Sequence, residues 1–300
     1  MIKIFHSDKF VPELPEGHKF PIQKYQLIRE QLLYEGSVQA DQLVESHEIS
    51  EEDILLVHEA DYWNRMKTLS LSPREVRRMG FPQSHQLVER SRRSCQGTLS
   101  AALWAKDHGL GMNIAGGTHH AYPDHGEGFC LLNDIAISIR HLQRHTYIQR
   151  ILIIDLDVHQ GNGNAHIFQD DVDVFTFSMH GKDNYPLRKE QSDLDINLPT
   201  GTSDSAYLDI LTNSLQDVLA SFQPAFIFFQ AGVDVLETDK LGKLSLTLEG
   251  LKRRDLLVLH LCKRQAIPLC VCIGGGYSAR LADTVAGHSQ TFRLAMDIYS

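Results

Sequence analysis

Mostly apolar runs recur along this chain and predict strands. The predicted strands cover residues 2–5, 112–115, 151–154, 172–177, 225–230 and 268–273. The run at 151–154 consists of three isoleucines and one leucine, with no alternation of polar and apolar positions. Such runs are typical of strands that are covered on both faces, as in a parallel sheet.

Segments with helical periodicity separate these strands. The predicted helices cover residues 86–106, 133–144, 164–168, 203–222, 248–264 and most of 278–298. Residues 38–70 are predicted to form short helices and connectors, and 187–204 a loop. Because strands and helices alternate without a linker or a repeat, we predict a single open α/β domain over residues 1–300. Its central sheet is predicted to be mostly parallel and flanked by helices.

The stretch 151–163 places charged groups where the pattern predicts a strand end. The apolar run continues into Asp155, Asp157 and His159, which would share one face of an extended strand, since side chains alternate. Open α/β folds bind ligands at the carboxyl ends of their strands. Two carboxylates and an imidazole brought together there favour a bound cation. The alternative is a buried polar cluster satisfied by hydrogen bonds.

Other predicted strands also end in polar or unusual residues. These are His119 and His120, Ser178 and Met179, Asp234, and Tyr277. Asp157, His159 and Asp234 together would leave an open position for water, as catalytic zinc sites do. Taken alone, Asp234 fits a turn or a cap equally well.

The histidine pair and the tyrosine have two interpretations each. Beside a metal, His119 and His120 would serve as general acid and base, and Tyr277 would donate a hydrogen bond to a developing oxyanion. Taken singly, each also fits an ordinary surface or core position. Gly128, Phe129 and Tyr185 are candidate walls of a narrow channel, or else anchors of hydrophobic loops.

Composition and charge narrow the function classes. The chain has 300 residues, of which 42% are apolar and 22% charged, as in ordinary globular proteins. Its formal net charge of −9 argues against direct nucleic-acid binding and favours a cationic substrate or partner. No apolar stretch is long enough to span a membrane, and the N-terminus lacks a signal sequence. Five cysteines in apolar or helical context predict reduced thiols and a cytoplasmic protein.

Six motifs in this chain resemble those of the histone deacetylase family. They are GGTHHA at 116–121, GFC at 128–130, ND at 133–134, DLDVHQGNG at 155–163, DKLGKLSLT at 239–247 after Asp234, and GGGY at 274–277. The resemblance implies the arginase/deacetylase α/β fold. The phrase HKFP at 18–21 and the compact length are most similar to the class IV branch and its bacterial relatives.

The resemblance implies a role for each matching residue. Asp157, His159 and Asp234 would bind one Zn²⁺, His120 would be the main base and acid, and His119 its electrostatic partner. Tyr277 would polarise the acyl carbonyl. The implied channel residues are Gly128, Phe129, Tyr185 and Gly275. A structural K⁺ would be held by Asp155, the Ser178 hydroxyl, and the carbonyls of Asp157, His159 and Met179.

The sequence departs from that of some relatives in two respects. Asn162 stands where those relatives place a carboxylate behind the second histidine, which should leave His120 less basic. The acidic residue that holds the substrate backbone at the rim has no counterpart in the 70–85 segment.

The predicted function is therefore a zinc-dependent amidohydrolase that removes an acetyl or longer acyl group from lysine. The resemblance to class IV makes long acyl chains plausible. The substrate would be acylated lysine in a protein or peptide, and the main alternative is an acylated polyamine. Two further alternatives are an arginase-like ureohydrolase, which needs a two-metal carboxylate cluster, and a non-catalytic module that binds acylated ligands.

Overall fold

A computed structural model describes residues 2–7 and 11–300. An eight-stranded sheet forms its centre, in the order β2-β1-β3-β8-β7-β4-β5-β6, and every pair of neighbouring strands is parallel. The predicted α/β architecture is confirmed, and the sheet is parallel throughout its described residues. The strands are β1 (Lys3–His6), β2 (Leu43–Glu45), β3 (Leu110–Asn113), β4 (Ile151–Asp155), β5 (Val174–Gly181), β6 (Leu194–Leu198), β7 (Phe226–Ala231) and β8 (Leu269–Ile273).

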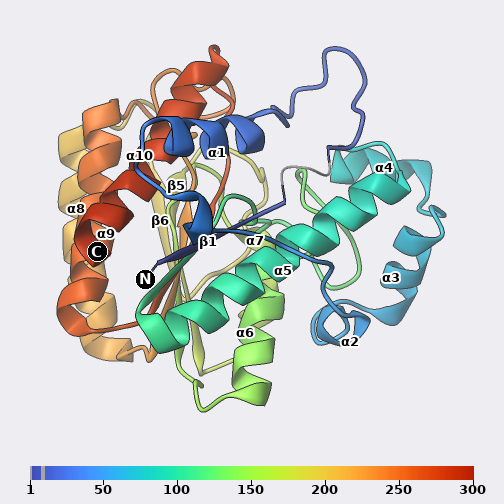
Figure 1. Ribbon diagram of the computed structural model, residues 1–300, viewed down its shortest axis with the longest axis horizontal. Coiled ribbons are helices and arrows are strands. Elements are labelled where there is room, and N and C mark those ends of the chain that lie inside the picture. The colour runs from blue at the N-terminus through green and yellow to red at the C-terminus, as the bar shows by residue number, and fades with distance from the viewer. Residues whose placement is uncertain (1, 8–10) are drawn as a thin grey trace.

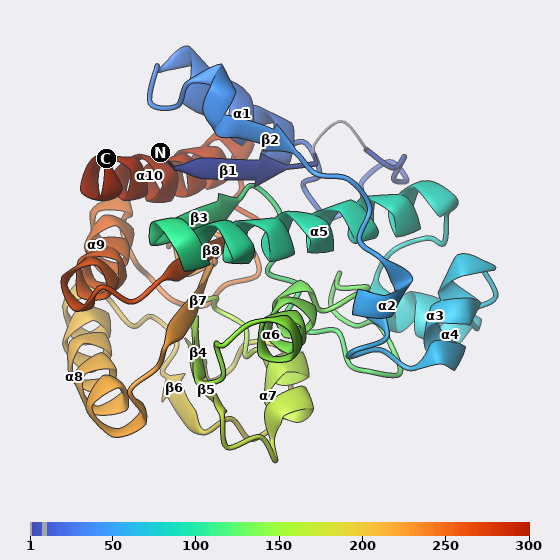
Figure 2. The same cartoon turned by 60° about the horizontal axis from the view of Figure 1, so that its bottom comes forward.

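Helices cover both faces of this sheet (Figure 1). They are α1 (Lys24–Tyr34), α2 (Glu51–Ile54), α3 (Ala60–Lys67), α4 (Pro73–Met79), α5 (His85–His108), α6 (Asp134–His145), α7 (Asn162–Phe168), α8 (Asp204–Phe222), α9 (Leu248–Gln265) and α10 (Leu281–Tyr299). Figure 2 shows α5, α6 and α7 on one side of the sheet and α8, α9 and α10 on the other. The short helices α2, α3 and α4 form a group beside the N-terminal part of α5, where α3 contacts α5 and α2 contacts α6.

The position of β4 in the sheet explains why residues 151–154 are all apolar. Leu152 and Ile154 belong to the core beneath one face of the sheet, and Ile151 and Ile153 to the core beneath the other. All four side chains are fully buried or nearly so. Burial of each is worth roughly 1.5–3 kcal/mol, which fixes the strand in the middle of the sheet.

The two outermost strands were missed by the sequence pattern. Strand β2 lies in the region predicted as short helices and connectors, and β6 lies in the predicted 187–204 loop. Both are edge strands with mostly half-exposed residues, so neither carries an unbroken apolar run. The strand predicted to begin at residue 172 begins at Val174, because the Val172 side chain is 88% exposed.

The alternation predicted through 155–159 is confirmed, because Leu156 and Val158 lie in the same core cluster as Leu152 and Ile154, whereas Asp157 and His159 line the pocket. The extended backbone is shorter than predicted. Strand β4 ends at Asp155, and the following residues form bends.

All five cysteines are buried and none is bonded to another. No helix of the described residues is long and apolar enough to cross a membrane.

Candidate functional site

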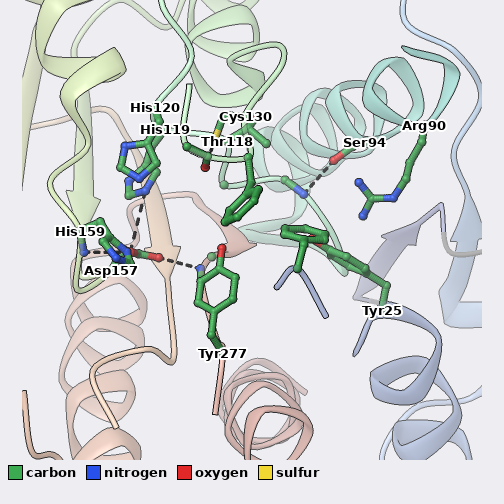
Figure 3. A pocket seen from close by; sticks show the side chains of 17 residues that line it. Tyr25, Arg90, Ser94, Thr118, His119, His120, Cys130, Asp157, His159 and Tyr277 are labelled. Atoms are coloured by element: carbon green, nitrogen blue, oxygen red, sulfur yellow. Dashed lines mark hydrogen bonds and ion pairs between the residues drawn. The ribbon is translucent and has the colours of Figure 1, made fainter. Parts of the chain in front are cut away.

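The carboxyl ends of four central strands converge on one pocket. His119 and His120 follow β3, Asp157 and His159 follow β4, and Asp234 follows β7. Tyr277 follows β8, and its hydroxyl group points into the pocket on the side of Asp157 (Figure 3). Residues more than 150 positions apart in sequence therefore meet because parallel strands end at the same edge.

Three buried side chains form a candidate metal centre. The Nδ1 atom of His159 lies 3.0 Å from Oδ1 of Asp157 and 3.2 Å from Oδ2 of Asp234. One ligand atom from each of the three residues lies within 4.8 Å of the other two. A set of one imidazole and two carboxylates suits a divalent cation such as Zn²⁺ and leaves room for a further ligand.

The donor atoms of this centre fit a cation better than they fit one another. Oδ2 of Asp234 is buried and accepts no hydrogen bond from the described residues, although His159 lies nearby. Burial, reinforced by the charge of Asp157, raises the pKa of Asp234. Burial alone would lower the pKa of His159, but Asp157 and Asp234 outweigh it and raise that pKa to about 10. The raised pKa keeps a proton on His159 between the two carboxylates, and a bound cation would replace that proton.

Glycines let the backbone approach the carboxylates closely. A Cβ atom at Gly275 would lie 1.8 Å from Oδ2 of Asp234, and one at Gly232 would lie 2.3 Å from Oδ2 of Asp157. Both carboxylates are therefore enclosed by backbone, and the amide of Gly275 donates to Oδ2 of Asp157 at 2.7 Å.

The two histidines have different partners. Nδ1 of His119 lies 2.7 Å from Oδ2 of Asp155, and Nδ1 of His120 lies 2.5 Å from Oδ1 of Asn162. Burial lowers the pKa of His119, but Asp155 and Asp157 outweigh this effect and raise it to about 9. Burial, followed by the positive charges of neighbouring histidines, holds the pKa of His120 well below its usual range. A neutral His120 can accept a proton.

The partners of Asn162 were not found from sequence. Its amide nitrogen donates to the Tyr122 hydroxyl at 3.1 Å and to Oε1 of Glu127 at 2.9 Å. These two donations leave the carbonyl oxygen of Asn162 facing His120, so the histidine Nδ1 must carry the proton. Glu127 stands one residue before the GFC motif, and only its proximity to that motif could have drawn attention to it.

The loop that carries Tyr277 is fixed at three points. Oδ2 of Asp239 accepts from the Tyr277 amide at 2.6 Å, and Gly275 donates to Asp157. The ammonium group of Lys24 donates to the carbonyl of Gly274 at 2.8 Å. Lys24 is almost fully buried and lies 5.7 Å from the centre of the Tyr277 ring. Lys24 was not found from sequence, because it occurs at the start of an ordinary amphipathic helix.

The predicted channel residues surround the approach to these groups. Phe129 lies 6.1 Å from Tyr277 between ring centres, and Tyr185 lies 5.3 Å from His120. A Cβ atom at Gly128 would lie 2.7 Å from the His120 ring, and its φ of +55° also favours glycine. Outside the metal centre the channel opens into a cavity of about 450 Å³. A much smaller cavity of about 50 Å³ continues inward toward Tyr25 and Arg90.

The residues predicted to hold a monovalent cation are also adjacent. Asp155 pairs with Ser178 in the register of β4 and β5, and Met179 is the next residue of β5. All three are buried beneath the metal centre. Asp155 already binds His119 and the amide of Asp157, and the Ser178 hydroxyl lies 2.9 Å from Nδ1 of His180.

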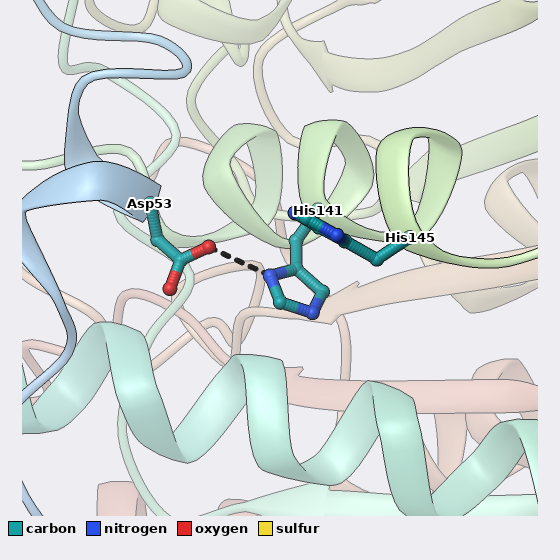
Figure 4. Close-up of side chains that lie close together, drawn as sticks. All are labelled: Asp53, His141 and His145. Atoms are coloured by element: carbon teal, nitrogen blue, oxygen red, sulfur yellow. Dashed lines mark hydrogen bonds and ion pairs between the residues drawn. The ribbon is translucent and has the colours of Figure 1, made fainter.

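A second group of possible ligands lies on the surface between α2 and α6 (Figure 4). It consists of Asp53, His141 and His145. Nδ1 of His141 lies 2.7 Å from one Asp53 oxygen, and the Ser50 hydroxyl donates to the other at 2.6 Å. Both carboxylate oxygens are thus occupied, and His145 is exposed. We interpret this group as a hydrogen-bonded contact between two helices.

Comparison with known proteins places these residues in one family. A family profile described as the histone deacetylase domain matches residues 18–292. An uncharacterized protein of Picosynechococcus is 46% identical over 296 residues, which is 99% of this chain and 98% of that protein. Histone deacetylase 2 of Arabidopsis thaliana is 32% identical over 278 residues, covering 90% of this chain and 72% of the plant protein.

Solved structures show the same fold. The crystal structure of a histone deacetylase homologue from Aquifex aeolicus superposes with a TM-score of 0.84 at 23% sequence identity. The match covers 98% of this chain and 84% of the Aquifex chain.

Proposed function

This chain belongs to the histone deacetylase family, and from that premise we propose that it is a zinc-dependent deacylase acting on acylated lysine. The observation that carries this proposal is the convergence of His120 and Tyr277 on the Asp157–His159–Asp234 centre. A Zn²⁺ ion there would lower the pKa of a water molecule and polarise the substrate carbonyl.

The protein's own groups would then move the protons. His120, neutral because its pKa is depressed, would take a proton from the attacking water and pass it to the leaving amine. The Tyr277 hydroxyl would donate a hydrogen bond to the carbonyl oxygen as negative charge develops on it. His119, which is hydrogen-bonded to Asp155, would contribute a positive charge to the site and would not itself transfer a proton.

The cavities support lysine-like substrates with short acyl groups. A chain entering past Phe129 and Tyr185 would place its amide at the metal centre, so the acyl group must point inward. The inner cavity is about 50 Å³ and the outer one about 450 Å³. We therefore propose that acetyl is preferred over long acyl chains, although the class IV resemblance made long chains plausible.

We also propose that a monovalent cation, most naturally K⁺, binds beneath the zinc. Asp155, the Ser178 hydroxyl and the backbone of Asp157, His159 and Met179 would be its ligands. The adjacency of β4 and β5 supports this site. Its role would be to steady Asp155, which in turn orients His119.

The test is an activity panel run on zinc-loaded protein, with and without a chelator. Lysine peptides carrying acetyl, butyryl, octanoyl and myristoyl groups would be compared at equal concentration. We expect hydrolysis that falls with chain length, is lost on chelation, and is lost in Asp157→Ala and His159→Ala. Intact zinc binding with no hydrolysis of any peptide would instead favour the non-catalytic binding module. Stoichiometric zinc in either variant would refute the ligand assignment.

A further inference from the structure

The mouth of the outer cavity carries a positive charge although the chain as a whole is acidic. Its lining residues include four cations, which are Lys19, Arg77, Arg78 and Lys243. Asp183 is the one carboxylate among the described residues that line it. The sign of this rim is therefore opposite to the formal net charge of −9.

Two of these cations are held in place by neighbouring groups. The Arg78 guanidinium lies 3.9 Å from Oε2 of Glu127, and the ammonium of Lys243 donates to the carbonyl of Asp183 at 2.8 Å. The carboxylate of Asp183 accepts from the Thr200 hydroxyl at 2.9 Å. Arg77 and Lys19 are exposed on the same rim. The cations that line the opening thus come from three separate segments of the chain.

The 70–85 segment supplies cations to the rim instead of an acidic residue. Glu75 is the one acidic residue in this segment, and it is occupied elsewhere. It accepts hydrogen bonds from the amide and hydroxyl of Ser72 at 2.8 and 2.6 Å and also pairs with Arg65. Arg77 and Arg78 therefore face the opening with no carboxylate from their own segment beside them.

We propose that this rim selects acyl-lysines flanked by acidic residues in a peptide and rejects acylated polyamines. When an acyl-lysine enters the channel, the residues before and after it must cross the mouth. Carboxylates there would lie within the Debye length of the rim cations, about 8–10 Å at moderate salt. A polyamine would bring its remaining ammonium groups to the same cations. The proposal rests on the deacylase function above and names its substrate class.

The first experiment compares three peptides of equal length with the zinc-loaded enzyme. Each carries one acetyl-lysine flanked on both sides by Glu, Gln or Lys, and acetylated spermidine is the fourth substrate. We expect kcat/KM to be roughly three- to tenfold higher for the Glu peptide than for the Gln peptide. The Lys peptide and the polyamine should be the poorest substrates. The differences should shrink between about 0.05 M and about 0.5 M salt, because exposed charges are screened.

Equal rates for the three peptides, or a preference for the Lys peptide or the polyamine, would overturn the proposal. Failure of the deacylase function would look different, since the uncharged Gln peptide would then not be hydrolysed either.

The second experiment assigns the preference to the rim. The double variant Lys19→Gln/Arg77→Gln should reduce the ratio of kcat/KM between the Glu and Lys peptides by roughly threefold or more. Arg253→Gln/Arg264→Gln is the matched control, because it also removes two exposed cations, both on α9 and outside the residues that line the channel. It should leave that ratio unchanged. An equal loss in both variants would show a general charge effect and refute the role of the rim.

Discussion

The amide of Gly275 donates a 2.7 Å hydrogen bond to Oδ2 of Asp157, so the loop carrying Tyr277 is joined directly to a metal ligand. A side chain does not fit at this glycine, because a Cβ atom there would lie 1.8 Å from Oδ2 of Asp234. One residue thus positions two ligands and the tyrosine loop. Motion of this loop and loss of metal should therefore be coupled.

Gly275→Ala should abolish zinc binding at neutral pH. A methyl group at this position would displace the Asp234 carboxylate, because backbone and buried groups surround it. Zinc content of the purified protein, measured by mass spectrometry, checks this. Gly201→Ala is the control, since no atom lies within 4 Å of its added Cβ and only the strain of a φ of +79° is introduced. Full zinc occupancy in Gly275→Ala would contradict the packing described here.

Tyr277→Phe should lower kcat by roughly 10²–10³ while zinc stays bound. The change removes only the hydroxyl group that would donate to the oxyanion. The contacts that hold the loop should remain, because Asp239, Asp157 and Lys24 all bind backbone atoms of the loop. Steady-state kinetics on an acetyl-lysine peptide measures the loss. Tyr34→Phe is a matched control, because the Tyr34 side chain is 91% exposed. Turnover equal to that of the unmodified protein would remove Tyr277 from the mechanism.

Replacing Asp53 or His141 should reduce stability without changing activity. Burial raises the pKa of Asp53, but hydrogen bonds from Ser50 and His141 outweigh it, so the net pKa is lowered. The stability from a lowered carboxyl pKa is present above the ordinary value, about 4, and is lost as pH falls through the folded value.

A double-mutant cycle of Asp53→Asn and His141→Ala should give a coupling of about 0.5–1 kcal/mol at pH 7. The coupling should shrink below about pH 4. Urea denaturation measures both quantities. If zinc added to protein already loaded at the catalytic centre stabilised it further, and His145→Gln removed that effect, our hydrogen-bond interpretation of this group would be wrong.

The sequence predicted the parts of the fold that are buried and missed those that are not. The apolar runs that became β4, β7 and β8 are covered on both faces, so burial alone makes their composition distinctive. Strands β2 and β6 lie at the edges, where pairing on one side determines them and side-chain burial does not.

The candidate site shows the same division. The residues predicted at strand ends lie side by side in the structure, because parallel strands bring those ends together, and their roles remain predictions. Lys24 was missed, and Asp239 was named only as the first residue of a motif and was given no role. Both act on backbone atoms, Lys24 as a donor to Gly274 and Asp239 as an acceptor from Tyr277. Contacts of this kind depend on the folded path of the chain and leave no pattern along it.

Asn162→Asp should move the acid limb of the kcat/KM profile to higher pH. The oxygen that faces His120 would become part of a carboxylate, which favours the imidazolium and raises the pKa of His120. His120 must be neutral to accept a proton. As the pH is lowered, the variant would therefore lose activity at a higher pH than the unmodified protein does. A shift of about one pH unit or more is expected.

The neighbouring carboxylate determines how this variant is best tested. Oε1 of Glu127 now accepts from the Asn162 amide at 2.9 Å, so a second carboxylate at 162 would repel it and could take up a proton instead. Adding Glu127→Gln replaces this repulsion with an amide that can donate to Asp. The double variant should therefore show the full shift of the acid limb, and Glu127→Gln alone should show little. If the acid limb of the double variant coincides with that of Glu127→Gln, then Asn162 does not tune the base, and His120 is not the group whose ionisation limits the reaction.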